Sequence, residues 1–228
     1  MKFQISRGKF IKISSVAMAG TLMSDFAIAG STVFNSKTNR VDDELRKKLI
    51  LHNDISVKSI LEERSTKPAS NLSSFRRLAV TVSCVTGSLC NEGSEYYKSK
   101  KLIGVLEEAL DIMLNAQYAD GTLDSGGNRQ SPPDTGFILE HLCSASVVLN
   151  RLEFKNLQGT KSKLEKFIKN AAGALVTGGV HTPNHRWVIC SALAQINELY
   201  PDVKYVERID EWLAEGIYIN EDGHFPER

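Results

Sequence analysis

The densest group of residues that could do chemistry lies in residues 178–187, which read G-G-V-H-T-P-N-H-R-W. The T-P pair in this segment is typical of a helix start, with threonine as the N-cap and proline at the first helical position. Asn184, His185 and Arg186 would then lie in the first helical turn, where free N–H groups and the helix dipole attract anions. An amide, an imidazole and a guanidinium placed there could bind the carboxylate of an acidic sugar.

Each of these residues also has an interpretation without a ligand. Asn184 and His185 could be solvated residues of a first helical turn, where polar side chains are common. His181 and His185 have the spacing of a metal site, but the intervening proline would place His181 before the helix, and no acidic third ligand follows, so we expect no metal. Trp187 fits the core better than a sugar platform, and we retain it as a candidate substrate contact.

A second polar segment spans residues 120–135 and reads D-G-T-L-D-S-G-G-N-R-Q-S-P-P-D-T. We expect a long polar loop, and long ordered loops on a helical scaffold often carry binding residues. Asn128 and Arg129 are therefore candidate substrate contacts. Asp120 and Asp124 could form a pair of catalytic carboxylates, although roles as turn and cap formers compete with that interpretation.

Apolar residues recur at helical spacing through most of the chain, and strand-like alternation is nearly absent. We therefore expect helices to hold the two polar segments in place. The sequence therefore predicts an all-α fold. The expected helices span residues 42–64, 73–90, 95–117, 134–152, 161–175, 183–200 and 203–215.

The signals for helix starts repeat along the chain. Pro133 and Pro183 are 50 residues apart, and each is followed four positions later by an aromatic residue. Residues 111–114 and 210–213 are similar to each other at an offset of 99 residues, close to two such repeats. A period near 50 with two helices per unit predicts an array of helical hairpins, either an open solenoid or a closed α/α toroid. Chance similarity between amphipathic helices is the alternative.

The N-terminal residues are expected to direct export rather than to fold. A basic start, an apolar stretch over residues 13–23 and the A-I-A sequence at 27–29 predict a signal peptide over residues 1–29. The apolar stretch is shorter than the roughly 20 residues of a transmembrane helix. Residues 6–12 resemble a twin-arginine export signal with glycine in place of the second arginine. Residues 30–41 would be a linker, and the mature protein would be periplasmic or extracellular, without membrane association.

The composition excludes some classes of partner. The net charge is +1, from 28 basic and 27 acidic residues, which gives no bulk attraction to nucleic acid or to a membrane surface. The cysteines lack the tight spacing of disulfide-rich or zinc-binding modules, so we expect buried free thiols. They are Cys84, Cys90, Cys143 and Cys190.

Together the hairpin period, the export signal and the segments at 120–135, 182–187 and 220–228 resemble the N-terminal α/α-toroid domain of secreted bacterial polysaccharide lyases, in particular the heparinase II/III-like and alginate-lyase-like enzymes. The resemblance covers most of residues 42–228. It implies an acidic polysaccharide substrate and no cofactor. It also implies that Asn184 and His185 neutralise a uronate carboxylate while a tyrosine removes the C5 proton and protonates the leaving oxygen. Arg186 as a further carboxylate contact is our inference from its position.

Such an elimination requires preorganised donors for the enolate-like charge and a nearby base. The tyrosine of the family would lie beyond Arg228, and Tyr200 and Tyr218 do not occupy its position. The chain also ends in a loop that corresponds to the one at 120–133. We therefore expect residues 42–228 to form an incomplete α/α toroid that lacks its C-terminal part, and the chain to be a lyase fragment that is inactive alone.

Two alternatives belong to other functional classes. A glycoside hydrolase on the same barrel would need two carboxylates that face one cleft. A non-catalytic glycan-binding or scaffold protein would retain carbohydrate without turnover.

Overall fold

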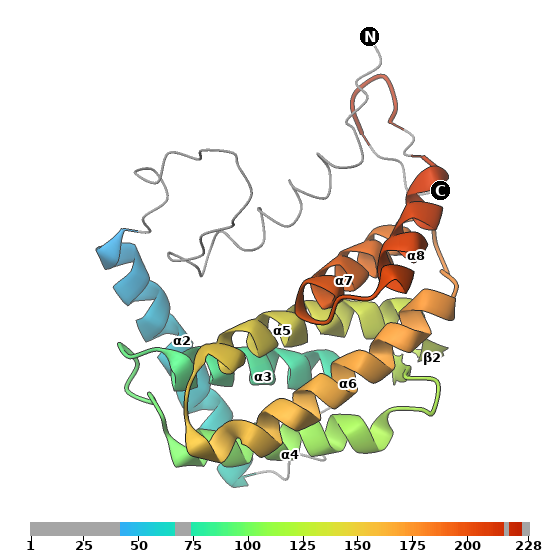
Figure 1. The fold of residues 1–228 in the computed structure, drawn as a ribbon. Helices are drawn as coiled ribbons and strands as arrows, with labels where there is room; N and C mark the ends of the chain where they lie inside the picture. The colour runs from blue at the N-terminus through green and yellow to red at the C-terminus, as the bar shows by residue number, and fades with distance from the viewer. Residues whose placement is uncertain (1–41, 67–73, 217–218, 225–228) are drawn as a thin grey trace.

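The structure, a computed structural model, describes residues 42–66, 74–216 and 219–224, and helices dominate these ranges (Figure 1). The predicted all-α class is confirmed, and each expected helix is present. The largest difference is at the start of the third helix, which begins five residues later than expected, because residues 91–99 form turns in which Lys98 has a positive φ of 55°. The helices are α2 (Asp43–Thr66), α3 (Phe75–Cys90), α4 (Lys100–Ala116), α5 (Pro132–Arg151), α6 (Gln158–Thr177), α7 (His185–Leu199) and α8 (Val203–Ala214).

Side-chain caps fix the starts of several helices. Ser74 accepts a hydrogen bond from the backbone N–H of Arg77 at the start of α3, and Asp202 caps α8 in the same way. The expectation that Thr182 caps α7 is wrong. Residues 182–187 first form a turn with hydrogen bonds between residues three apart, such as His185 N–H to the Thr182 carbonyl at 3.0 Å, so α7 begins at His185 and Asn184 is its N-cap residue.

The helices lie in two layers. α3, α5 and α7 pack side by side in one layer, α4, α6 and α8 form the other, and α2 packs against α3. Two polar contacts join the α4 region to α6. Gln117 Nε2, just after α4, donates to the Phe167 carbonyl in α6 at 3.2 Å, 50 residues away. Lys163 of α6 pairs with Asp111 of α4 at 2.7 Å. These contacts hold α4 and α6 side by side in their layer.

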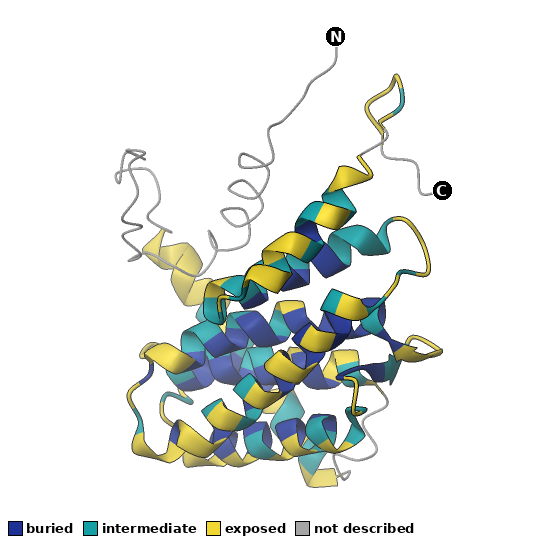
Figure 2. Ribbon diagram, turned by 45° about the vertical axis from the view of Figure 1, so that its right-hand side comes forward, coloured by how far each residue is buried: buried dark blue, intermediate teal, exposed yellow. Residues whose placement is uncertain are grey.

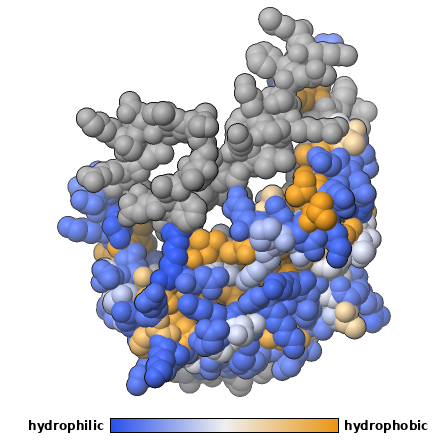
Figure 3. Space-filling model, in the orientation of Figure 1, coloured by the Kyte–Doolittle hydropathy of each residue, from blue (hydrophilic) through white to orange (hydrophobic). Residues whose placement is uncertain are grey.

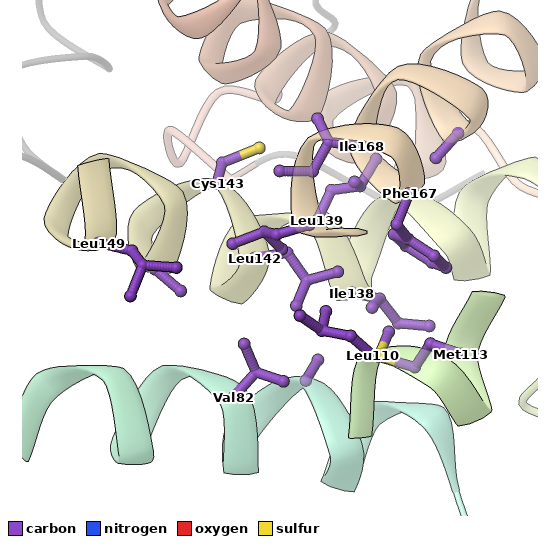
Figure 4. Close-up of a cluster of buried hydrophobic side chains, with 14 of the residues drawn as sticks. Val82, Leu110, Met113, Ile138, Leu139, Leu142, Cys143, Leu149, Phe167 and Ile168 are labelled. Carbon is purple, nitrogen blue, oxygen red and sulfur yellow. The ribbon is translucent and has the colours of Figure 1, made fainter. Parts of the chain in front are cut away.

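The core fills the space between the two layers (Figure 2). Figure 4 shows side chains from both layers meeting there. Phe167 is the largest fully buried side chain, with no exposed surface. Burial of one such side chain contributes about 1.5–3 kcal/mol. Other contributors are Val82 from α3, Leu110 and Met113 from α4, Leu139 and Leu142 from α5, and Ile168 from α6.

A buried carboxylate attaches α2 to the rest of the fold. Asp54 Oδ1 accepts hydrogen bonds from Ser88 Oγ at 2.5 Å and Ser94 Oγ at 2.6 Å, and Oδ2 accepts from the Glu95 N–H at 3.0 Å. Asn53, the preceding residue, donates to the Cys84 carbonyl at 2.8 Å. These bonds connect α2 to both α3 and the turn that follows it.

On the face seen in Figure 3 the described surface is mainly hydrophilic, with several apolar patches. None of the helices in the described ranges has the length and apolar character that crossing a membrane requires. The expected signal peptide at 1–29 and linker at 30–41 lie outside the described residues. The four cysteines are free thiols, of which Cys143 and Cys190 are buried.

Candidate functional site

The polar segment at 120–135 contains a β-hairpin, not only the loop expected from the sequence. β1 (Leu123–Ser125) and β2 (Asn128–Ser131) pair antiparallel and lie beside the start of α5 (Figure 1). Gly126 and Gly127, which join the two strands, have positive φ values of 62° and 86°. Positive φ at both residues is typical of the type I′ turn, which two-residue hairpin loops favour. The S-G-G-N sequence was the signal that could have predicted this turn.

The carboxylates of this segment stabilise its turns. Asp124 Oδ1 accepts from the Gln130 N–H at 2.7 Å, and Oδ2 accepts from the Tyr118 hydroxyl at 3.0 Å. Asp120 Oδ1 accepts from the Thr122 hydroxyl at 2.6 Å and from its N–H at 2.9 Å. The hydroxyl contact is the main reason why the pKa of Asp120 lies below its usual value. Both groups therefore act as turn formers.

Ser131 connects the hairpin to the segment around the histidines. Its Oγ donates to Asp134 Oδ2 at 2.7 Å, accepts from the Asp134 N–H at 3.2 Å, and lies 3.0 Å from His181 Nε2. Asn128 Nδ2 donates to the same Oδ2 atom at 2.9 Å. Asn128, a candidate substrate contact, thus helps to hold the buried Asp134 carboxylate. The two polar segments found in the sequence meet at this point.

His185 lies between two other rings. Its ring centroid is 5.9 Å from those of Phe137 and His181, with interplanar angles of 86° and 84°, so both contacts are edge to face. His185 Nδ1 is buried and has no hydrogen-bond partner among the described residues. Phe137 also contacts Arg76, whose guanidinium carbon lies 4.4 Å from the ring centroid, in cation–π geometry.

A connected set of five side chains joins these contacts, and we call it the histidine strip: Arg76, Phe137, His185, His181 and Ser131. Each member touches the next, although they come from the start of α3, the end of β2, the first turns of α5, and the start of α7 with the segment before it. Arg76 and His181 are exposed, whereas Phe137 and His185 are half-buried. The set therefore offers a cation, two imidazoles and an aromatic ring at the surface.

Arg186 faces a different element. Its Nη1 donates to Glu215 Oε2 at 2.6 Å, just after α8, and its Nε donates to the Pro183 carbonyl at 3.0 Å. Only 15% of its side chain is exposed. The structure therefore brings His185 together with His181, while it directs the guanidinium of Arg186 towards Glu215. The three adjacent donors do not converge on one point.

The remaining candidates are placed as follows. Asn184 is half-buried, and its Oδ1 accepts a hydrogen bond from the Thr182 hydroxyl. Trp187 is half-buried on α7, with the Arg186 guanidinium carbon 5.7 Å from its ring centroid. Arg129 is exposed in β2. Asn184 thus adjoins the strip in sequence, whereas Arg129 lies on the hairpin.

The described residues contain no group of three or more His, Cys, Asp or Glu side chains that could hold a metal ion. Comparison with known proteins gives no assignment, because no family model matches the chain, and no curated protein or solved structure matches it either. The site must therefore be interpreted from its own residues.

Sequence reasoning missed Arg76, Phe137 and Ser131 as members of the site. Phe137 was noticed only as part of the repeat, and the S-P-P-D sequence marked Ser131 as a helix start without indicating a partner. Nothing near Arg76 in the sequence indicates its contact with a ring 61 positions later.

Proposed function

We propose that the histidine strip binds uronic-acid units of an acidic polysaccharide, and that the protein is an exported polysaccharide lyase built on an α/α toroid. The observation that supports this proposal most is the unbroken line of contacts from Arg76 through Phe137 to His185 and His181. A uronic-acid unit combines a carboxylate substituent with an apolar face of ring C–H groups, and the strip offers a matching cation and aromatic ring.

His185 has a defined direction for its polar contact. Because Nδ1 is buried and unpartnered among the described residues, Nε2 is the ring nitrogen that can meet a ligand. Asn184 precedes it directly and is only half-buried. We propose that these two side chains neutralise the uronate carboxylate, as the sequence resemblance implies. This neutralisation would stabilise the enolate-like charge that develops when the C5 proton leaves.

Elimination also needs a base. In the described part of the chain, no tyrosine hydroxyl hydrogen-bonds to the strip. The Tyr118 hydroxyl donates to Asp124, and the Tyr200 hydroxyl lies 3.4 Å from Ser146 Oγ. Binding is therefore the function that we propose for the described residues, and a tyrosine base for turnover is not part of this proposal.

The glycoside hydrolase alternative receives less support from the same geometry. It requires two carboxylates that act on one glycosidic bond. Asp120, Asp124 and Asp134 each accept hydrogen bonds from donors of their own segment, and Asp134 is only 6% exposed. A non-catalytic glycan-binding protein would use the strip as proposed and would differ only in turnover.

The test compares acidic and neutral polysaccharides with the full chain. Oligosaccharides from alginate, heparan and chondroitin are titrated by calorimetry, with dextran oligosaccharides of equal length as the neutral control. We expect saturable binding of at least one acidic series, weakened by added salt, and none of dextran. The same mixtures are followed for the ultraviolet absorbance of an unsaturated uronate. Equal binding of neutral and acidic chains, or no binding at all, would contradict the proposal.

A further inference from the structure

We infer that His181 is a further ligand-contacting residue, held by Ser131 and Asp134 with its proton on Nε2 so that Nδ1 accepts a hydrogen bond from a sugar hydroxyl. The role of His181 in ligand binding rests on the proposed function. The tautomer of the His181 ring rests only on the hydrogen bonds around Ser131.

The hydroxyl of Ser131 has one proton and can accept two hydrogen bonds. Its proton goes to Asp134 Oδ2, at 2.7 Å, a distance typical of a charge-assisted hydrogen bond. One acceptor position is filled by the Asp134 N–H at 3.2 Å. The contact with His181 Nε2 at 3.0 Å must therefore use the remaining acceptor position, and Nε2 must be the donor.

The reverse arrangement is unfavourable because Asp134 is buried. A carboxylate can only accept hydrogen bonds, and this one is 6% exposed. If the serine proton turned to His181, Oδ2 would keep only the Asn128 donor, at 2.9 Å, and a buried charged oxygen would lose a hydrogen bond. The carboxylate thus determines the tautomer of His181 through the serine hydroxyl.

The same arrangement leaves one atom of His181 for a ligand. Nδ1 then carries a lone pair, and it has no partner among the described residues, while the residue as a whole is exposed. A lone pair attracts a hydroxyl proton and repels a carboxylate. His181 would therefore contact a hydroxyl of the sugar whose carboxylate meets Asn184 and His185. This pairing would favour a uronic acid with a free hydroxyl over a simple carboxylate.

The first experiment concerns the free protein. In the full chain with nitrogen-15-labelled histidine, long-range proton–nitrogen spectra should show His181 with its proton on Nε2 and with slowed exchange of that proton with water. Ser131→Ala should abolish the slow exchange, and Ser131→Thr, which keeps a hydroxyl, should restore it. A proton on Nδ1, or a spectrum that Ser131→Ala leaves unchanged, would overturn the assignment.

The second experiment adds an acidic oligosaccharide that binds in the calorimetric test. We expect the His181 Nδ1 signal to shift on binding. His181→Gln, whose amide lies nearer the Nε2 position, should bind about tenfold more weakly than wild type. His181→Asn keeps an amide oxygen near the Nδ1 position but loses the Ser131 contact, so it should bind more weakly than wild type and more tightly than His181→Gln.

The outcomes separate the two proposals. If the oligosaccharide binds but Nδ1 does not shift and His181→Gln binds like wild type, the ligand role of His181 is wrong and the proposed function stands. If none of the acidic oligosaccharides binds, the proposed function fails and the ligand role fails with it. The tautomer measurement still decides the serine–aspartate arrangement in that case.

Discussion

Ser131 Oγ and His181 Nε2 lie 3.0 Å apart in the fold although 50 residues separate them in the sequence. The contact exists because α5 and α7 pack side by side, so that the residue that caps α5 meets the segment that leads into α7. Ser131 thus has two roles. It caps a helix, and it fixes the histidine strip to the β-hairpin.

Ser131→Ala should lower the free energy of unfolding by about 1–3 kcal/mol, because it removes the cap of α5 and one donor to the buried Asp134. Urea denaturation measures this change. Ser144→Ala is the control, since the Ser144 hydroxyl donates only to the Glu140 carbonyl of the same helix. Equal stability of the two variants would show that the Ser131 contacts contribute little.

Gly178→Ala should destabilise the packing of Gly178, at the end of α6, against Pro132 at the start of α5. A Cβ atom at Gly178 would lie 2.4 Å from Pro132 Cγ and 2.6 Å from the Ala174 carbonyl oxygen. Relief of that overlap must move backbone, at a cost of about 1–3 kcal/mol. At Gly179 a Cβ atom meets nothing within 4 Å, so Gly179→Ala is the matched control. Thermal unfolding distinguishes them, and a lower midpoint for Gly179→Ala than for Gly178→Ala would contradict this account.

Asp54→Ala should detach α2 from α3. The change leaves Ser88, Ser94 and the Glu95 N–H without their acceptor, and hydrogen bonds to charged groups contribute about 1.5–3 kcal/mol each at most. Hydrogen exchange should rise in α2 more than in α5 or α6. Asp43→Ala, at the exposed start of α2, is the control and should leave exchange near wild type. Uniform exchange in both variants would argue against a local role for Asp54.

Cys143 should make the protein less stable at alkaline pH. Burial raises the pKa of its thiol to about 12, from 9.0 for an exposed thiol. Below pH 9 the thiol is neutral in both states, so it adds no pH dependence. Between about pH 9 and 12 the thiol ionises only in the unfolded chain, so unfolding becomes more favourable as pH rises.

The measurement is the free energy of unfolding at about pH 8 and pH 10, for wild type and Cys143→Ala. Burial also raises the pKa of Cys190 to about 12, so that thiol should remain as a source of the same kind of loss in the variant. The decrease between the two pH values should be smaller in Cys143→Ala. An identical decrease in both proteins would mean that the Cys143 thiol ionises as easily in the folded state as in the unfolded one.

The helices and their approximate ends could be predicted from local signals. Ser131 followed by proline marked a helix start, which the side-chain cap of α5 confirms, whereas the repeat suggested by the offset between Pro133 and Pro183 stays a prediction. The closure of the array into a toroid and the lyase activity remain proposals.

The site was harder to predict because its contacts are tertiary. The expectation that adjacent donors act together did not foresee that Arg186 would pair with Glu215, 29 residues later. Likewise, the position of Arg76 over Phe137 depends on the packing of α3 against α5, for which a single sequence gives no local signal. The side chains of the neighbours His185 and Arg186 contact different elements, whereas residues distant in the sequence form the strip.

Neighbouring arginines on α3 provide the most direct test of the binding surface. Arg76 contacts the Phe137 ring, whereas Arg77 pairs with Glu63 of α2 at 2.5 Å, so one belongs to the strip and the other does not. Both are exposed and carry the same charge. Calorimetric titration of an acidic oligosaccharide into Arg76→Ala and Arg77→Ala should show about tenfold weaker binding for Arg76→Ala, which corresponds to about 1.4 kcal/mol, and near wild-type binding for Arg77→Ala. Equal losses in the two variants, or no loss in Arg76→Ala, would contradict the assignment of the histidine strip as the sugar-binding surface.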